Sequence, residues 1–83
     1  MGDRRKKPSE AFGQVLRELR TQKGLTQEAL ALEAGTERSH ISALERAEKG
    51  PSLATILQLA RALGVSAGEI VSMVEDRLAH RKR

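Results

Sequence analysis

Residues 24–46 read GLTQEALALEAGTERSHISALER, and this stretch decides the fold of the chain. It predicts two short helices joined by a tight turn at Gly35, because a glycine after the last apolar position of a helix takes the left-handed conformation at low cost. Thr26 is expected to cap the first helix and Thr36 the second. One helix therefore ends and the next begins within about two residues, which leaves the pair steeply crossed.

Apolar residues recur at helical spacing on one side of each predicted helix and are expected to face inward. They are Leu30 and Ala34 on the first helix and Ile41 and Leu44 on the second. Ala31 is small where the two backbones are expected to approach most closely. The opposite face of the second helix is mostly polar, with Glu37, Arg38, Ser39, Ser42, Ala43 and Arg46.

Three features of this stretch resemble the Cro/C1-type (Xre-like) helix-turn-helix repressors. They are the Leu-Thr-Gln-Glu-Ala-Leu-Ala run of the first helix, Gly35 at the turn, and Ile-Ser-Ala-Leu-Glu-Arg in the second helix. Residues 51–66 are similar to the helix that follows in that family. The resemblance implies an all-α, compact five-helix, lambda-repressor-like domain. It also implies a sequence-specific transcriptional regulator, a repressor or an activator, that binds a palindromic operator in double-stranded DNA as a homodimer.

Length and composition bound the possibilities independently of the resemblance. The 83 residues suit one domain with a modest core, and the absence of cysteine excludes disulfides and thiolate metal sites. No run of residues is apolar and long enough for a membrane span or a signal peptide, so a cytoplasmic location is expected. A single phenylalanine, with no tryptophan or tyrosine, argues against base stacking on single-stranded nucleic acid.

The net charge of +4 resides in the two ends of the chain. Residues 1–8, expected to be a disordered basic arm, carry +3, and residues 80–83, a basic tail, carry another +3. Residues 9–79, the predicted domain, hold eight Lys and Arg against ten Asp and Glu. The ends are therefore either solvated tails or arms that attract DNA phosphates.

The flanking helices are predicted from the same signals of capping and periodicity. Ser9 is expected to cap a helix that continues to about Lys23 and faces Phe12, Val15, Leu16 and Leu19 inward. Ser52 is expected to cap a fourth helix that ends at Gly64 and buries Leu53, Ile56, Leu57, Ala60 and Leu63. Ser66 and Glu69 form a capping box for a fifth helix, with Val65 and Ile70 as its hydrophobic staple.

The fifth helix carries more apolar surface than a terminal helix of a small monomer needs. We expect the excess to form a dimer interface of Ile70, Val71, Met73, Val74 and Leu78. The alternative is that these side chains complete the core over the first helix.

The resemblance places two residues in a structural ion pair, Arg20 and Glu45, although Arg20 could instead reach solvent. It also matches Gln27 to a glutamine that bonds a DNA phosphate, a role that the N-terminus of a helix favours. The third helix, about residues 37–46, is the predicted reader of the major groove.

Arg38 is the strongest candidate for a base contact, since a guanidinium bonds guanine at two points, and a phosphate contact is its alternative. Glu37 either accepts from a cytosine amino group or, as we slightly prefer, favours the helix N-terminus by its charge. Thr26 is above all a cap, and His40 lies partly buried or toward phosphate. The predicted DNA-contacting set is Thr26, Gln27, Thr36, Glu37, Arg38, Ser39, His40, Ser42, Ala43, Arg46 and Lys49.

The loop at residues 47–51 departs from the family pattern, because Ala47 stands where the family often has glycine. The third helix is therefore expected to extend to Glu48 or Lys49. Ser39, Ser42 and Ala43 have little reach, so specificity is expected to depend partly on DNA shape or on paired half-sites.

Two other function classes are an enzyme and a protein-interaction module of the same fold. No catalytic cluster of His, Cys or carboxylates is spaced for an enzyme, and the two histidines are too isolated for a metal site, so neither a metal, a cofactor nor a small-molecule ligand is expected. A protein-interaction module of the same fold, an antitoxin-like binder or an adaptor, is the alternative to a DNA-binding regulator, because residues 9–79 carry a net negative charge.

Overall fold

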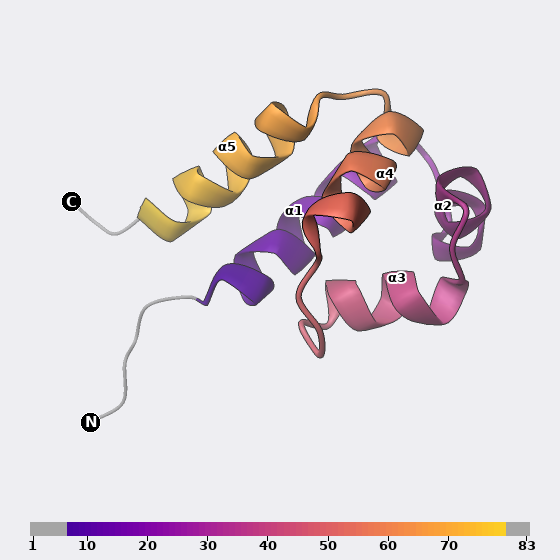
Figure 1. Ribbon diagram of the computed structural model, residues 1–83, viewed down its shortest axis with the longest axis horizontal. Helices are drawn as coiled ribbons and strands as arrows, with labels where there is room; N and C mark the ends of the chain where they lie inside the picture. The colour runs from indigo at the N-terminus through magenta and orange to yellow at the C-terminus, as the bar shows by residue number, and fades with distance from the viewer. Residues whose placement is uncertain (1–6, 80–83) are drawn as a thin grey trace.

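The computed structural model describes residues 7–79, which form five helices: α1 (Pro8–Gln22), α2 (Gln27–Ala34), α3 (Arg38–Glu45), α4 (Leu53–Leu63) and α5 (Ala67–Ala79) (Figure 1). The prediction of an all-α, five-helix fold is confirmed. Helix α1 packs against both α3 and α5, and α2 packs against α3 and α4. The remainder of the predicted basic arm and all of the predicted tail, residues 1–6 and 80–83, lie outside the described residues.

The start of α1 differs from the prediction. Lys7, and not Ser9, is the N-cap residue, and its backbone N–H donates to Glu10 Oε1 at 3.2 Å. Pro8 occupies the first turn, where a missing N–H costs nothing because the first N–H groups of a helix have no partner within it. The helix therefore begins at the last residue of the predicted arm.

The pair of helices α2 and α3 follows the prediction at two of its three capping and turn positions. Thr26 Oγ1 accepts a hydrogen bond from the Ala29 N–H at 3.0 Å, and Gly35 is left-handed with φ of +75°. Thr36 is not the cap of α3, since Glu37 is the N-cap residue and makes no side-chain capping bond. The Thr36 hydroxyl instead lies 3.0 Å from Nδ1 of His40, and it therefore does not cap a backbone N–H group of α3.

The end of α3 contradicts the predicted extension of that helix. The helix ends at Glu45, and Ala47 adopts a left-handed conformation with φ of 62°. The N–H of Ala47 donates to the Leu44 carbonyl at 3.2 Å and that of Glu48 to the Ala43 carbonyl at 2.9 Å. These two bonds form the turn that usually has glycine at its left-handed position, so Ala47 takes the conformation of the glycine it replaces.

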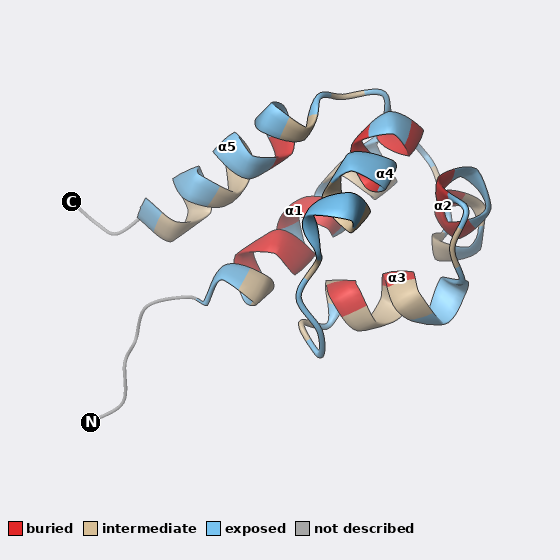
Figure 2. Ribbon diagram, in the orientation of Figure 1, coloured by how far each residue is buried: buried red, intermediate tan, exposed pale blue. Residues whose placement is uncertain are grey.

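The core is formed by buried side chains from all five helices, and Figure 2 shows many of them along α1. The buried apolar set is Ala11, Phe12, Val15, Leu16, Leu30, Ala31, Ala34, Ile41, Leu44, Leu59, Ala60, Ala62, Leu63 and Ile70. The prediction that Leu53 and Leu57 of α4 belong to the core is wrong, because their exposed fractions are 70% and 53%. Leu59 and Ala62 are buried in their place, since α2 and α5 cover a different side of α4.

Helix α5 begins as predicted and then packs along α1. Ser66 Oγ accepts from the Glu69 N–H at 3.0 Å, and Glu69 Oε1 accepts from the Ser66 N–H at 2.9 Å. Ile70 is 1% exposed, so the prediction that it lies in a dimer interface is wrong and Ile70 belongs to the core. Met73 and Val74 are partly buried against the same core, whereas Val71 is 43% exposed.

Gly13 allows α1 to approach the end of α3 more closely than any other residue type would permit. A Cβ at this position would lie 2.7 Å from the carbonyl oxygens of both Leu44 and Glu45. These atoms belong to the backbone and cannot turn aside as a flexible side chain would. The absence of a side chain at Gly13 therefore sets how deeply α3 seats on α1.

We expect Gly13→Ala to destabilise the fold by about 2 kcal/mol, because the cost of overpacking exceeds the gain in helix propensity. Gly68→Ala is the matched control, since its Cβ would lie 3.7 Å from Ser66 Oγ, an ordinary contact, and should leave stability unchanged or raised. Urea unfolding followed by far-ultraviolet circular dichroism measures both variants. Equal stability of the two would contradict the close approach.

Candidate nucleic-acid interface

The carboxylate of Glu45, at the last turn of α3, is bound from two other helices. Arg20 of α1 donates from Nε to Glu45 Oε2 at 2.6 Å and from Nη2 to Oε1 at 3.1 Å. The side chains of Arg20 and Glu45 are only 11% and 3% exposed. The ion pair that the resemblance implied is therefore present in the structure, and Arg20 does not reach into solvent.

Arg20 also secures the connection between α1 and α2. Its third donor, Nη1, bonds the carbonyl oxygen of Leu25 at 2.8 Å, just before the cap of α2. The hydrogen bonds with Glu45 raise the pKa of the Arg20 guanidinium above its ordinary value, while burial acts in the opposite direction. Arg20 therefore remains charged and satisfies three acceptors at once.

Gln27, the first residue of α2, is part of the same cluster. Its side-chain Nε2 donates to Glu45 Oε1 at 3.0 Å, so the amide that was expected to contact a phosphate bonds Glu45 here. Beside it lie the first N–H groups of α2, which have no partner within the helix and favour an anion. The N-terminus of α2 and the end of α3 are thus held together by one carboxylate.

The outward face of α3 carries the side chains that the sequence analysis predicted to contact DNA. Glu37, Arg38 and Ser39 are exposed, and Ser42 and Ala43 are half-buried. Ile41 and Leu44 are fully buried on the opposite side. The helix thus separates into an inward apolar side and an outward face with one exposed cation near its start.

A shallow hollow of about 390 Å³ adjoins this face at the end of α3. It is lined by Ser39, His40, Ala43, Glu48 and Lys49, and it brings three predicted contact residues of α3 together with one from the following loop. Thr26 caps α2 and Thr36 bonds His40, so their hydroxyls are engaged within the protein.

Arg46, the C-cap residue of α3, is paired with a residue that the sequence analysis did not select. Its Nε lies 3.0 Å from Glu48 Oε2, and its Nη2 donates to Glu48 Oε1 at 3.1 Å. The signal that could have revealed Glu48 is the departure at Ala47. A glycine-type turn there folds residue 48 back onto the helix end.

Within residues 7–79, no group of three or more His, Asp or Glu side chains is placed to hold a metal ion. No single helix in this range meets the length and apolarity needed to cross a bilayer. Helices α4 and α5 meet them only when taken together, and the chain bends by 108° between the two.

Comparison with known proteins places this arrangement in a family. A model of the helix-turn-helix family matches residues 16–70, which include α2, α3, α4 and part of α1. The chain belongs to the Cro/C1-type helix-turn-helix family. It is therefore a DNA-binding regulator of transcription, in a class of proteins that are not enzymes.

Three known proteins illustrate the similarity. An HTH-type transcriptional regulator of Sinorhizobium fredii is 41% identical over 58 residues, which span 70% of this chain and 75% of that protein. An immunity repressor of Bacillus phage phi105 is 39% identical over 59 residues, or 71% of this chain and 41% of the repressor. The crystal structure of the restriction-modification controller protein C.AhdI from Aeromonas hydrophila superposes with a TM-score of 0.73 at 48% identity. It covers 75% of this chain and 94% of the controller protein.

We expect Arg20→Met to destabilise the protein by about 3 kcal/mol, because it leaves the Glu45 carboxylate buried without its cation. Arg77→Met is the control. Arg77 pairs with Glu18 and donates to Gln14 at the surface between α5 and α1, and the loss of such an exposed pair should cost less than about 1 kcal/mol. Chemical unfolding of both variants makes the comparison.

The double variant Arg20→Met/Glu45→Met should recover part of the stability, because no charge is then buried without a partner. If Arg20→Met and Arg77→Met lowered the free energy of unfolding equally, the buried cluster at Glu45 would stabilise the protein no more than the surface pair of Arg77 does.

Proposed function

We propose that the chain binds an operator in double-stranded DNA with α3 in the major groove, and that it represses transcription by occupying the promoter. The observation that carries this proposal is the division of α3 into a locked inward side and an exposed outward face. Major-groove readers need a helix whose position is set by the protein and whose outward side chains are free to meet base edges.

Within this proposal the residues have different roles. Arg38, exposed on the first turn of α3, contacts a base, and Ser39, Ser42 and Ala43 make the short-range contacts beside it. Gln27 and the N-terminus of α2 meet a phosphate, with Thr26, Thr36, His40, Arg46 and Lys49 along the backbone. Glu37 favours the N-terminus of α3 by its charge.

The charge distribution supports a contribution from the ends of the chain. Residues 9–79 carry ten acidic and eight basic side chains, so the domain alone attracts phosphate weakly. Arg4, Arg5, Lys6 and Lys7 at one end and Arg81, Lys82 and Arg83 at the other supply the excess positive charge. These basic residues are proposed to add a salt-dependent affinity that is independent of sequence.

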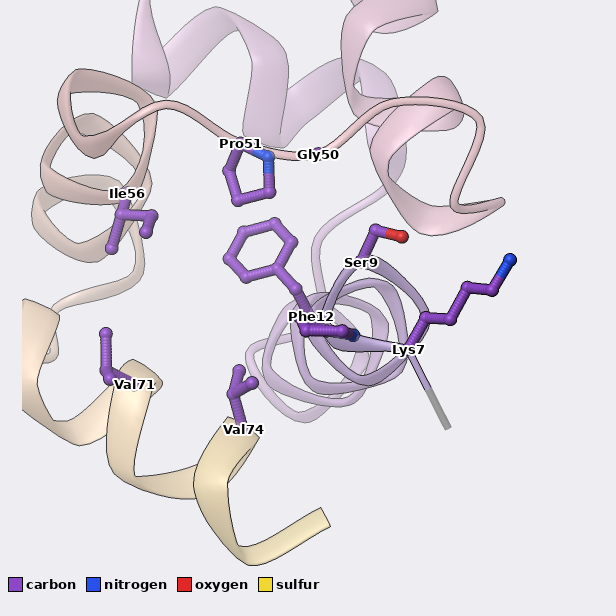
Figure 3. Close-up of a pocket in the computed structure, with 9 residues that line it drawn as sticks. Lys7, Ser9, Phe12, Gly50, Pro51, Ile56, Val71 and Val74 are labelled. Carbon is purple, nitrogen blue, oxygen red and sulfur yellow. The ribbon is translucent and has the colours of Figure 1, made fainter. Parts of the chain in front are cut away.

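We further propose that the chain acts in the cytoplasm as a homodimer with one α3 per half-site, and that the two copies meet through α4 and α5. An apolar groove of about 580 Å³ lies between the start of α1, α4 and α5, and Figure 3 shows Phe12, Pro51, Ile56, Val71 and Val74 around it. Leu53 and Leu57, one turn apart on α4, add exposed apolar surface. This surface retains Val71 and Val74 of the expected interface, with Met73 and Leu78 half-buried on the same helix, whereas Ile70 belongs to the core.

The first test is selection of bound sequences from a random duplex pool, followed by titration of the selected duplex. Arg38→Ala should weaken binding about 10- to 100-fold and relax the preference at one base pair, as the loss of a two-point guanine contact does. Arg61→Ala, which removes an equally exposed cation from α4, should change affinity little.

If Arg38→Ala weakened binding without changing the preference at any base pair, Arg38 would contact a phosphate and not a base. No enrichment of any duplex, at low or high salt, would exclude the operator and favour a protein partner.

The second test is the oligomeric state. Leu57→Asp should shift the protein from dimer to monomer in analytical ultracentrifugation, because it places a carboxylate in the proposed apolar interface. Leu32→Asp is the control, since Leu32 is 82% exposed on α2 and does not line the apolar groove. A wild-type protein that sediments as a monomer at high concentration, or an equal effect of the two variants, would refute this interface.

A further inference from the structure

The turn after α3 places a carboxylate at the proposed DNA-binding face. Ala47 is left-handed, and the hydrogen bond from the Glu48 N–H to the Ala43 carbonyl folds the chain back over the last turn of the helix. Glu48 consequently lines the same hollow as Ser39, His40, Ala43 and Lys49. An acidic side chain here is unexpected, because the other side chains that line the hollow are neutral or basic and suit a polyanion.

The carboxylate of Glu48 occupies the donors of Arg46 at two points. Arg46 Nε is 3.0 Å from Oε2, and Arg46 Nη2 is 3.1 Å from Oε1. A phosphate group offers the same pair of acceptor oxygens to a guanidinium. Since the side chains of Arg46 and Glu48 are 62% and 57% exposed, the pair is weak enough to open and DNA can reach it.

We propose that Glu48 is an internal competitor of DNA phosphate for Arg46 and that it restrains the affinity of the protein for duplex DNA. This inference rests on the proposed function. Binding exchanges the Glu48 carboxylate for a phosphate on the same guanidinium, and it leaves the freed carboxylate beside a negatively charged backbone. Because every sequence has a phosphate to offer, the restraint acts on operator and random duplex alike.

Counterion release follows from the same exchange. An unpaired Lys or Arg side chain that binds a phosphate adds about 0.9 to the magnitude of the slope of log affinity against log salt concentration, because a condensed counterion leaves the DNA. Paired Arg46 brings no net positive charge to the complex. The salt slope of the wild-type protein is therefore shallower than the number of its phosphate-contacting cations implies.

The test is titration of operator and random duplexes with Glu48→Gln over a range of salt concentrations. We expect affinity for both duplexes to rise about 3- to 10-fold at low salt, and the salt slope to steepen by up to about 0.9. The control is Glu75→Gln, which makes the same charge change at an exposed position of α5 and should have a smaller effect.

A double-variant comparison separates competition for Arg46 from general repulsion. In an Arg46→Gln background, Glu48→Gln should raise affinity less than it does in the wild type, because no guanidinium is released and only the repulsion between the carboxylate and the DNA backbone is relieved. A gain in this background as large as the gain in the wild type would overturn the proposal. So would a loss of affinity in Glu48→Gln alone, which would mean that Glu48 positions Arg46 or contacts a base.

A measurement without DNA distinguishes this inference from the proposed function. The Nε–H resonance of Arg46 in the free protein should shift in Glu48→Gln and stay unchanged in Glu75→Gln. If it did not shift, the pairing would be refuted even if the protein binds an operator. If the resonance shifts but neither wild type nor any variant binds duplex DNA, the proposed function fails, and the competition with phosphate fails with it.

Discussion

One carboxylate joins three helices at the C-terminal end of α3. Glu45 of α3 accepts two hydrogen bonds from Arg20 of α1 and one from Gln27 of α2, and its side chain is almost fully buried. A buried carboxylate without partners would be very costly, so the three side chains hold one another in place. The position of α3 relative to the N-terminus of α2 depends on this cluster.

Apolar packing alone would hold α3 weakly. The helix has only eight residues, too few to be stable in isolation, and its buried apolar side chains are Ile41 and Leu44. Gly13 compensates by letting α1 meet the carbonyl groups at the end of α3 without an intervening side chain. The close backbone approach and the ion pair both act at the C-terminal turn of α3, and its N-terminal turn projects outward with Arg38.

Features that arise from neighbouring residues were predictable from the sequence. The caps at Thr26, Ser52 and Ser66 and the left-handed Gly35 each depend on atoms a few residues apart. The Arg20–Glu45 pair was implied by the family resemblance. Features set by packing were not predictable in this way. Leu53 and Leu57 repeat like core positions but are exposed. Thr36 is an exception among the local features, since its hydroxyl contacts His40, four residues along the chain, and does not cap α3. Ala47 has a high helix propensity but adopts the left-handed conformation of a turn. This turn places Glu48 at the candidate site.

The division of α3 into two sides also shapes how the protein can evolve. Everything that secures the helix lies on its inward side or at its end, whereas Arg38 and Ser39 are exposed and fill no space in the core. Substitutions at such positions usually change folding stability by less than about 0.5 kcal/mol. With α3 in the DNA-reading role proposed above, descendants of this chain can exchange the outward residues one at a time, acquiring new targets without passing through forms that fail to fold.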